Sequence, residues 1–523
     1  MSRGRLPVLV VVAGLLLAGG LADRAGRPST TRAVALAVGS GAAPASATSS
    51  TWYCTGAHAR PDGDAVGTVV LVNAGRRVLR GRVTVVPDKG SRRSVPVRVP
   101  AAGRAGVRLA DVVTADNASA LVEMDGGQVV AELVTRGPKG DSATPCASST
   151  SDTWYFADGA TTRDAAEVLM VFNPFPEDAL VDLSFSTEQG RAVPEALAGL
   201  VVKGRGMLAV SVGDYVRRRA AVSTIVTSRV GRLVVARLQV FDGTGDVPRT
   251  GVSLALGAPD PRAVWYFPEG FAGDGTTERV HVFNPSAREA RIEIEVLLDQ
   301  GEADPVGLTV PAVSRVTFTV NEEPRVPPNV GHAIVVRATN GVAVVAERTV
   351  EALPPSARTG LAITLGATRA ASRWAFAAGE PDAAVEEWVT VLNPGARAVT
   401  VSVTALDGAK RVRVPGLQRL RVPAGGRLPI RLADHIARPV PSVVVQATGP
   451  VVVERDLYRA SARPRHGDGH TALSRPRVRL LVRLLVGLHG GEDGGEDLGR
   501  VVLEVVARPQ EHEAADEHRR ADE

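Results

Sequence analysis

The stretch Arg291-Ile292-Glu293-Ile294-Glu295-Val296 alternates charged and apolar side chains. Neighbouring side chains of a strand point to opposite faces of a sheet, so a period of two predicts a strand with one face in a core and the other in water. Val316-Thr317-Phe318-Thr319-Val320 and Val401-Ser402-Val403-Thr404 repeat the pattern, and Asn340-Gly341 and Asp407-Gly408 suit the turns between strands. The chain is therefore expected to be all-β, with seven or eight strands in each unit described next.

These strands belong to a unit that occurs four times. Each copy opens on a tryptophan and has an asparagine 19 to 21 residues later, an arginine in a turn after about 50 residues, and an apolar strand ending in charge after about 80. The landmarks are the tryptophans Trp52, Trp154, Trp265 and Trp374, the asparagines Asn73, Asn173, Asn284 and Asn393, the turn arginines Arg104, Arg205, Arg315 and Arg427, and the glutamates Glu132, Glu347 and Glu454. Spacings of 102, 111 and 109 residues between the tryptophans indicate a tandem array.

A unit of about 105 residues is long enough to bury its own core, so the copies are expected to fold independently, like beads. The strand pattern predicts an antiparallel β-sandwich for each, with a jelly roll as one form of it. The predicted domains are 51–150, 151–260, 261–370 and 371–474.

The landmark residues have structural and functional interpretations. Each tryptophan either plugs one end of a sandwich core or offers an exposed platform for sugar stacking, and the core is the favoured role. Each asparagine is expected to end a strand and cap a turn. The glutamates are expected to pair with the turn arginine or the opening segment and not to form a binding site.

The N-terminus indicates export. Residues 1–5 form a basic cytoplasmic segment, and residues 6–22 form an uncharged hydrophobic stretch that predicts a helical signal anchor or a cleaved signal peptide. The anchor is favoured, which gives a single-pass membrane protein with extracytoplasmic domains; the alternative is secretion after cleavage. Residues 23–50 are expected to be a flexible linker.

The two cysteines agree with an oxidising compartment. Cys54 lies beside the first tryptophan and Cys146 at the end of the same unit, so a disulfide would join the terminal strands of the first domain. Closing a loop of this length stabilises the fold by at most about 4 to 5 kcal/mol. Free thiols or a metal pair are the alternatives.

Other features give no sign of chemistry. No catalytic, cofactor or metal motif stands out, so an enzyme is not expected, and a net charge of +5 over 523 residues gives no nucleic-acid footprint. Residues 475–523 depart from the repeat and are expected to form an irregular tail. This tail is either a translated shifted frame or a basic amphipathic segment for a membrane surface.

The landmark series Trp-Tyr-Phe, Phe-Asn-Pro and Val-Val-Ala-Glu-Arg resembles a tandem β-sandwich repeat of exported or membrane-anchored actinobacterial proteins of unknown function. It is also similar, more weakly, to the sensory rhodopsin transducer. The resemblance covers about residues 50 to 473 and brings no catalytic residue with it.

Two functions follow as expectations. The first is a non-catalytic cell-envelope scaffold or protein-interaction module, held at the membrane by its N-terminal segment. The alternative is an array that binds cell-wall polysaccharide, which would require exposed aromatic side chains. An envelope hydrolase comes third.

Overall fold

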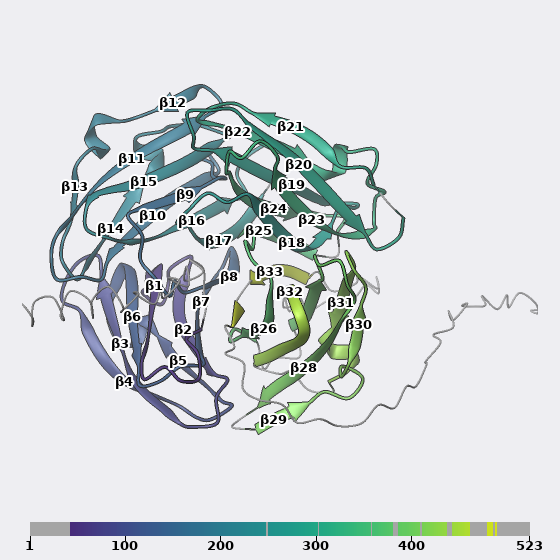
Figure 1. Cartoon of the computed structure of the whole chain (residues 1–523). Helices are drawn as coiled ribbons and strands as arrows, with labels where there is room; N and C mark the ends of the chain where they lie inside the picture. The colour runs from purple at the N-terminus through teal and green to yellow at the C-terminus, as the bar shows by residue number, and fades with distance from the viewer. Residues whose placement is uncertain are drawn as a thin grey trace, which may run out of the picture. The chain divides into compact units, whose positions relative to one another are not determined.

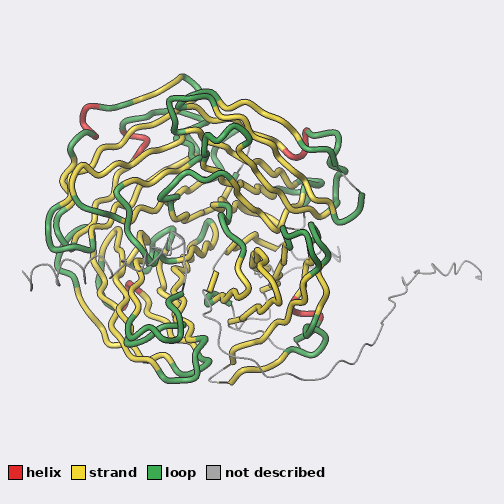
Figure 2. The backbone as a smooth tube through the Cα atoms, in the orientation of Figure 1, coloured by secondary structure: helices red, strands yellow, loops and turns green. Residues whose placement is uncertain are grey.

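A computed structural model describes residues 42–246, 249–301, 303–356, 358–379, 385–407, 410–436, 442–460, 478–484 and 487–488. Strands dominate these residues, as Figure 2 shows. Helical structure within them is confined to five three-residue 3-10 turns, η1 (Leu109–Asp111), η2 (Glu195–Leu197), η3 (Val212–Asp214), η4 (Val320–Glu322) and η5 (Leu432–Asp434). The all-β prediction is confirmed. The hydrophobic stretch 6–22 lies outside the described residues, and no helix among those described is long and apolar enough to cross a membrane.

The third repeat shows the plan of the unit, which is two packed antiparallel sheets (Figure 1). One sheet has the order β18–β23–β20–β21 and the other β22–β19–β24–β25. The strands are β18 (Val264–Phe271), β19 (Thr276–Asn284), β20 (Ala290–Leu298), β21 (Val306–Val310), β22 (Ser314–Thr319), β23 (Gly331–Ala338), β24 (Val345–Ala352) and β25 (Arg358–Leu365). In β20, Ile292, Ile294 and Val296 are buried while Arg291 and Glu293 are exposed, as the alternation predicts.

Repeat 1 has sheets β4–β3–β6–β1 and β5–β2–β7–β8. Its strands are β1 (Ser50–Ala59), β2 (Val66–Asn73), β3 (Leu79–Pro87), β4 (Arg93–Val99), β5 (Arg104–Arg108), β6 (Ala115–Met124), β7 (Val129–Gly137) and β8 (Gly140–Pro145). In repeat 2, β12 and β13 both pair with β11 in the sheet that continues through β15 to β9, and the second sheet is β14–β10–β16–β17. These strands are β9 (Thr153–Phe156), β10 (Ala165–Asn173), β11 (Ala179–Thr187), β12 (Gly190–Ala192), β13 (Leu200–Val202), β14 (Gly206–Ser211), β15 (Val222–Val230), β16 (Val234–Asp242) and β17 (Thr250–Leu256).

Repeat 4 follows the same plan with one long strand serving both sheets. The first part of β32 pairs with β26 and β28, and the later part pairs with β27 and β33. The strands are β26 (Ala371–Phe376), β27 (Val385–Leu392), β28 (Val399–Asp407), β29 (Lys410–Arg413), β30 (Leu420–Val422), β31 (Arg427–Arg431), β32 (Ser442–Ala460), β33 (Val478–Leu484) and β34 (Gly487–Leu488). The segment 475–523, expected to be irregular, therefore contains the strands β33 and β34, and β33 pairs with β32 as β25 pairs with β24.

The tryptophans and asparagines have the same surroundings in every repeat. Trp52, Trp154, Trp265 and Trp374 are at most 3% exposed, so none is a stacking platform. Each asparagine side-chain nitrogen donates to the carbonyl four residues later and to the end of the strand that precedes the turn arginine, and each side-chain oxygen accepts from the amide two residues later. A buried amide with these partners closes the turn after its strand, as the sequence predicted.

The last strand of each repeat contacts that of the next. The Ser142 hydroxyl of β8 bonds the backbone of Leu254 in β17, and Ser253 of β17 bonds Ile363 of β25 in the same way. Next, β25 pairs in parallel with β33, which lies beside β8. The contacts run from repeat 1 through 2, 3 and 4 back to 1. The four repeats therefore belong to one compact unit and are not spaced apart like beads, while the independent folding of each repeat stays a prediction.

Candidate functional site: the interfaces between repeats

Repeat 2 meets repeat 3 through buried charges. Arg237 of β16 donates to Glu347 of β24 at 2.9 Å, and both side chains are fully buried. Glu347 also accepts the backbone N–H of Asp158, which follows β9, at 2.7 Å. The Asp158 carboxylate in turn accepts from Arg315 at 3.0 Å and from Thr349 at 2.6 Å. The turn arginine and the strand glutamate of repeat 3 thus both hold the opening segment of repeat 2.

Repeat 3 meets repeat 4 through the same positions. Arg348 donates to Glu454 at 2.5 Å, and Glu454 accepts the backbone N–H of Glu269 at 3.0 Å. Arg427 bonds the Glu269 carboxylate, which also accepts the hydroxyl of Thr390 at 2.8 Å. The partners are 106 and 158 residues apart, so each pair joins two repeats and does not lie within one.

Repeat 4 meets repeat 1 with part of this set. Glu132 accepts the backbone N–H groups of Ala377 and Ala378, the former at 2.9 Å. Arg104 donates to the carbonyl of Gly379 at 2.5 Å. The charge of Arg455 acts on Glu132 and lowers its pKa, and Arg455 donates to Glu387 of its own repeat at 2.5 Å. Glu132 of repeat 1 therefore joins the last repeat to the first and completes the cycle of contacts.

The interface between repeats 1 and 2 is apolar at the same positions. The sheet registers place Leu133 where the other repeats have Arg237, Arg348 and Arg455, and place Ala236 where they have a glutamate. Met207 stands at the position of the turn arginine, and its sulfur accepts from Ser119 at 3.5 Å. Both partners of the ion pair are therefore absent together, so neither of these two positions carries a buried charge without its partner.

The register also corrects one landmark. Arg205 was predicted to be the turn arginine of repeat 2, but Phe172 pairs with Met207, as Phe283 pairs with Arg315. Arg205 is exposed and takes a positive φ of 53°, like Ala102 and Val313 at the equivalent place in their turns. The turn arginine is therefore present in repeats 1, 3 and 4.

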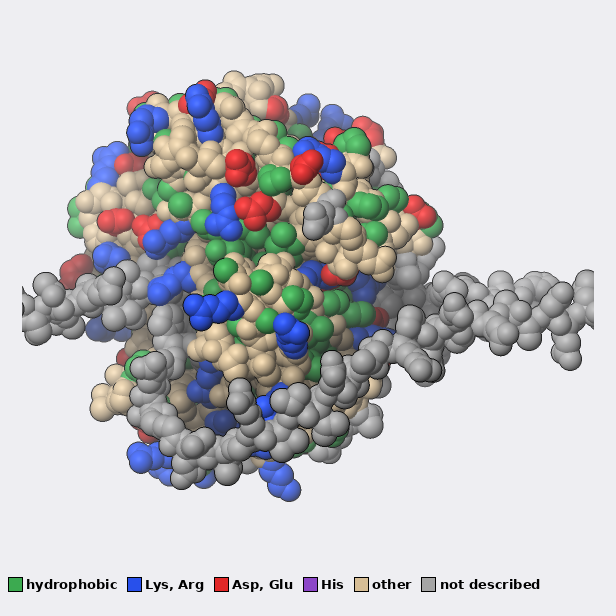
Figure 3. Space-filling model, turned by 45° about the vertical axis from the view of Figure 1, so that its right-hand side comes forward, with side chains coloured by type: hydrophobic (Ala, Val, Ile, Leu, Met, Phe, Trp, Pro, Cys, Tyr) green, Lys and Arg blue, Asp and Glu red, His purple; other side chains and the backbone are tan. Residues whose placement is uncertain are grey.

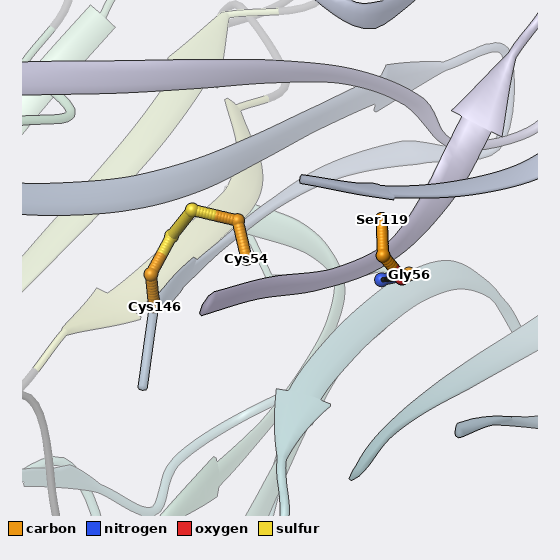
Figure 4. The surroundings of a disulfide bond; sticks show 4 residues. All are labelled: Cys54, Gly56, Ser119 and Cys146. Carbon is orange, nitrogen blue, oxygen red and sulfur yellow. Dashed lines mark hydrogen bonds between the residues drawn. A yellow bond between two sulfur atoms is a disulfide. The ribbon is translucent and has the colours of Figure 1, made fainter. Parts of the chain in front are cut away.

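The disulfide is another place where repeat 1 differs from the other repeats. Cys54 and Cys146 are bonded, with Cα atoms 4.4 Å apart, which confirms the predicted pairing (Figure 4). In repeats 2 and 3 these positions hold a phenylalanine and a glycine, and the added Cβ at Gly257 would lie 2.7 Å from the Phe156 ring. Arg237 lies over that ring at 5.4 Å. Where repeat 1 loses the arginine, the bonded cysteines replace the ring and the glycine.

Burial shifts the pKa values of the acids at the interfaces. Burial raises the pKa of Glu132 to about 7, although the N–H groups of Ala377 and Ala378 and the charge of Arg455 oppose it. Burial raises the pKa of Glu167 to about 8, with Arg237 opposing. Burial alone would also raise the pKa of Asp158, but the neighbouring His281, Arg315 and Arg237 lower it well below its usual range.

His281 lies against the same aspartate. Its Nε2 is 3.5 Å from a carboxylate oxygen of Asp158, and its Nδ1 lies 3.0 Å from the hydroxyl of Thr317. Burial lowers the pKa of His281 to about 3, in spite of the opposing effect of Asp158. The imidazole is therefore neutral at physiological pH, and its hydrogen bond with Thr317 holds it beside the aspartate.

Glu132, Glu347 and Glu454 each bind an opening segment, which the sequence predicted as one of two possible partners, but that segment belongs to the neighbouring repeat. Arg237, Arg348 and Asp158 carry the contacts between repeats, and a signal for them exists, because a charge that recurs within an apolar strand requires a buried partner. Within the described residues, no group of three or more His, Cys, Asp or Glu side chains could hold a metal ion. These carboxylates accept structural hydrogen bonds in closed interfaces.

Comparisons with known proteins give a family match over part of the chain. Residues 127–321 match the model of a family of unknown function, DUF5719. No curated protein matches the chain.

Among solved structures, the chain is similar to the Thermotoga maritima protein 1070, with 17% identity over 21% of this chain and 95% of that one, at a TM-score of 0.19. It is similar to the Anabaena sensory rhodopsin transducer, with 23% identity over 17% and 88% of the two chains and a TM-score of 0.16. It is also similar to a Streptomyces avermitilis alpha-L-rhamnosidase complexed with L-rhamnose, with 11% identity over 65% and 44% and a TM-score of 0.14.

Proposed function

We propose that this protein is a non-catalytic scaffold of the cell envelope, held outside the cytoplasm by its N-terminal segment. The observation that carries the proposal is the use of the recurring charged residues. Glu132, Glu347 and Glu454 are fully buried and hold the opening segment of the neighbouring repeat. Side chains committed to joining repeats are suited to rigid assembly and not to turnover.

The disulfide supports the extracytoplasmic location. Bonds such as that between Cys54 and Cys146 persist in oxidising compartments and are rare in the cytosol. The bond lies in repeat 1, the repeat nearest to the hydrophobic stretch 6–22 in the sequence. A covalent closure there would protect the first repeat from unfolding near its anchor.

The polysaccharide-binding alternative gains no support from the tryptophans, because their indoles are buried and cannot stack on sugars. Exposed aromatic surface among the large side chains of the described part is limited to Phe175 and Tyr215, at 37% and 44% exposure. Both lie in repeat 2. We therefore favour the scaffold.

Two assays test the proposal on the full chain in its own host. In intact cells, a protease that cannot cross the membrane should cleave the chain, and alkylation without reduction should leave Cys54 and Cys146 unlabelled. Isothermal titration of the purified chain with cell-wall polysaccharide should show no saturable heat. A chain that resists the protease only until the cells are lysed would contradict the location. Saturable glycan binding lost on Phe175→Ala or Tyr215→Ala would favour the alternative.

A further inference from the structure

One segment of each repeat differs sharply in charge from copy to copy. It runs from the landmark asparagine to the turn that precedes the turn-arginine position. In repeat 1 (74–103) it holds eight Lys or Arg residues and one acid, and in repeat 4 (394–426) six and one. In repeat 2 (174–206) it holds three and five, and in repeat 3 (285–314) two and six. A chain-wide preference for arginine would not reverse the sign between copies, so the distribution calls for a local cause.

The basic segments form exposed strands. In repeat 1 they are β3 and β4, where Arg80 lies directly opposite Arg98. Like charges at opposed positions destabilise a sheet, so folding alone does not favour this pair. Acids near this face are Asp88 in the turn between β3 and β4, Glu123 of β6, which lies 3.7 Å from Arg82, and Asp125 just after β6, which accepts the backbone N–H of Arg80.

The equivalent face of repeat 4 is formed by β28, β29 and β30. Arg413 and Arg421 are exposed there and lie opposite Thr404 and Thr400. Neither arginine makes an ion pair with an acid among the described residues. Asp407 is the acid of this segment, and it pairs in register with Lys410 at the other end of β29.

The interface between repeats 4 and 1 joins the two basic faces. Arg373 donates to the carbonyl of Ala74 at 3.2 Å, and Arg411 donates to the same oxygen. Burial and the nearby charge of Arg76 lower the pKa of Arg411, and burial and Arg411 lower that of Arg373. The charges that act on these two guanidinium groups among the described residues are those of other arginines. In Figure 3, blue side chains outnumber red ones in the lower part of the view.

The surface is also hollowed next to the basic hairpin. Three clefts of about 570, 730 and 700 Å³ border β3 and β4 or the turn between them. Seven Lys or Arg residues line them together with the four acids Asp88, Asp111, Glu123 and Asp125, so cations predominate.

We propose that the outer sheets of repeats 1 and 4 form one surface that binds a linear polyanion with repeating phosphate groups. Arginine suits phosphate because its planar fork donates two parallel hydrogen bonds. The inference goes beyond the scaffold role and does not depend on the location of the chain.

Other occupants fit less well. A lipid surface favours bulky apolar anchors, whereas the exposed large apolar side chains near this face are valines, Val78 and Val412. Single-stranded nucleic acid favours exposed aromatic rings for base stacking, and Phe175 and Tyr215 lie outside both basic segments. A second copy would have to offer the acidic segments of repeats 2 and 3, where Asp182 already pairs with Arg229 at 2.6 Å and Glu295 with Arg337 at 2.7 Å, so self-association is one outcome of the test below.

The test uses the full chain and labelled inorganic polyphosphate, followed by fluorescence anisotropy at several salt concentrations. The test variant combines Arg98→Ser, Arg413→Ser and Arg421→Ser. The matched control combines Arg191→Ser, Arg217→Ser and Arg288→Ser, which removes the same charge from exposed positions of repeats 2 and 3. Circular dichroism and thermal melting establish that both variants fold.

We expect wild type and control to bind within about twofold of each other, and the test variant to bind roughly tenfold more weakly with a shallower salt dependence. Phosphatidylglycerol vesicles, single-stranded DNA and orthophosphate should bind at least about tenfold more weakly than polyphosphate. Equal losses in the two variants, or equal binding to vesicles or DNA, would overturn the proposal. Concentration-dependent self-association that competes with polyphosphate would assign the surface to a second copy instead.

Discussion

The interface between repeats 1 and 2 (interface 1/2) and that between repeats 2 and 3 (interface 2/3) join equivalent faces of the repeats, but the first is apolar and the second is charged at the same two positions. At interface 2/3 the positions hold Arg237 and Glu347, and at interface 1/2 they hold Leu133 and Ala236. Replacing a buried ion pair by apolar residues of suitable volume is often neutral or stabilising, whereas removing one partner is costly. Where repeat 1 meets repeat 2, both members of the pair are apolar, so no charge is left there without its partner.

The largest expected effect comes from breaking one charged interface. Arg348→Met leaves Glu278 and Glu454 buried without the guanidinium that lies between them, and should lower the free energy of unfolding by about 3 to 5 kcal/mol. Urea denaturation measures this. The matched control is Arg325→Met, whose exposed pair with Glu323 should be worth less than about 1 kcal/mol. Equal losses in the two variants would remove the distinction between interface and surface charges.

The next largest effect is expected from removing the disulfide, which in repeat 1 occupies the positions of a phenylalanine and a glycine in repeats 2 and 3. Cys54→Ser with Cys146→Ser should lower the free energy of unfolding by about 2 to 4 kcal/mol. Reductant should destabilise the wild type by a similar amount and leave the variant unchanged. The pair Cys54→Phe with Cys146→Gly imports the residues of repeats 2 and 3, and should be more stable than the serine pair. If the serine variant matched the oxidised wild type, the bond would have no structural role.

The apolar pair of interface 1/2 can be introduced at interface 2/3 by mutation. Arg237→Leu alone leaves the buried carboxylate of Glu347 without its arginine, whereas Arg237→Leu with Glu347→Ala reproduces the residues of interface 1/2. The double variant should recover about 2 kcal/mol of the loss caused by the single change. A double-mutant cycle by chemical denaturation measures this coupling. Additive losses would show that the two side chains do not act as a pair, against their 2.9 Å contact.

The smallest expected effect is a pH dependence at interface 2/3. Because burial raises the pKa of Glu167 to about 8 from 4.5, its contribution to stability is fully present below pH 4.5 and is lost as the pH rises through about 8. Glu167→Gln should therefore gain about 1 kcal/mol over wild type between about pH 7 and about pH 9. Thermal denaturation across this range measures the difference. Parallel pH profiles would contradict a protonated Glu167 in the folded state.

The sequence predicted what depends on one repeat alone. The alternation at 291–296 predicts β20, and the recurrence of Asn284 and its equivalents predicts the turns, because strand period and turn chemistry are local.

The sequence did not predict which repeat each charge contacts. Arg237 and Glu347 are 110 residues apart, and the pattern within one repeat is equally compatible with pairing inside it. Arg205 was wrongly assigned as the turn arginine for a related reason. Repeat 2 lacks the Val-Pro-Ala spacing that locates this arginine in the other repeats. Only the strand register identifies Met207.

The central claim is that the four repeats close into a cycle, with repeat 4 against repeat 1. A thiol-reactive crosslinker of short reach tests it most directly in Arg76→Cys with Arg411→Cys, since both residues lie at the Ala74 carbonyl region and the native cysteines are bonded to each other. The account predicts rapid intramolecular crosslinking in this variant and none in Arg288→Cys with Arg411→Cys. Equal, slow crosslinking in both pairs would show that the repeats behave as separate beads.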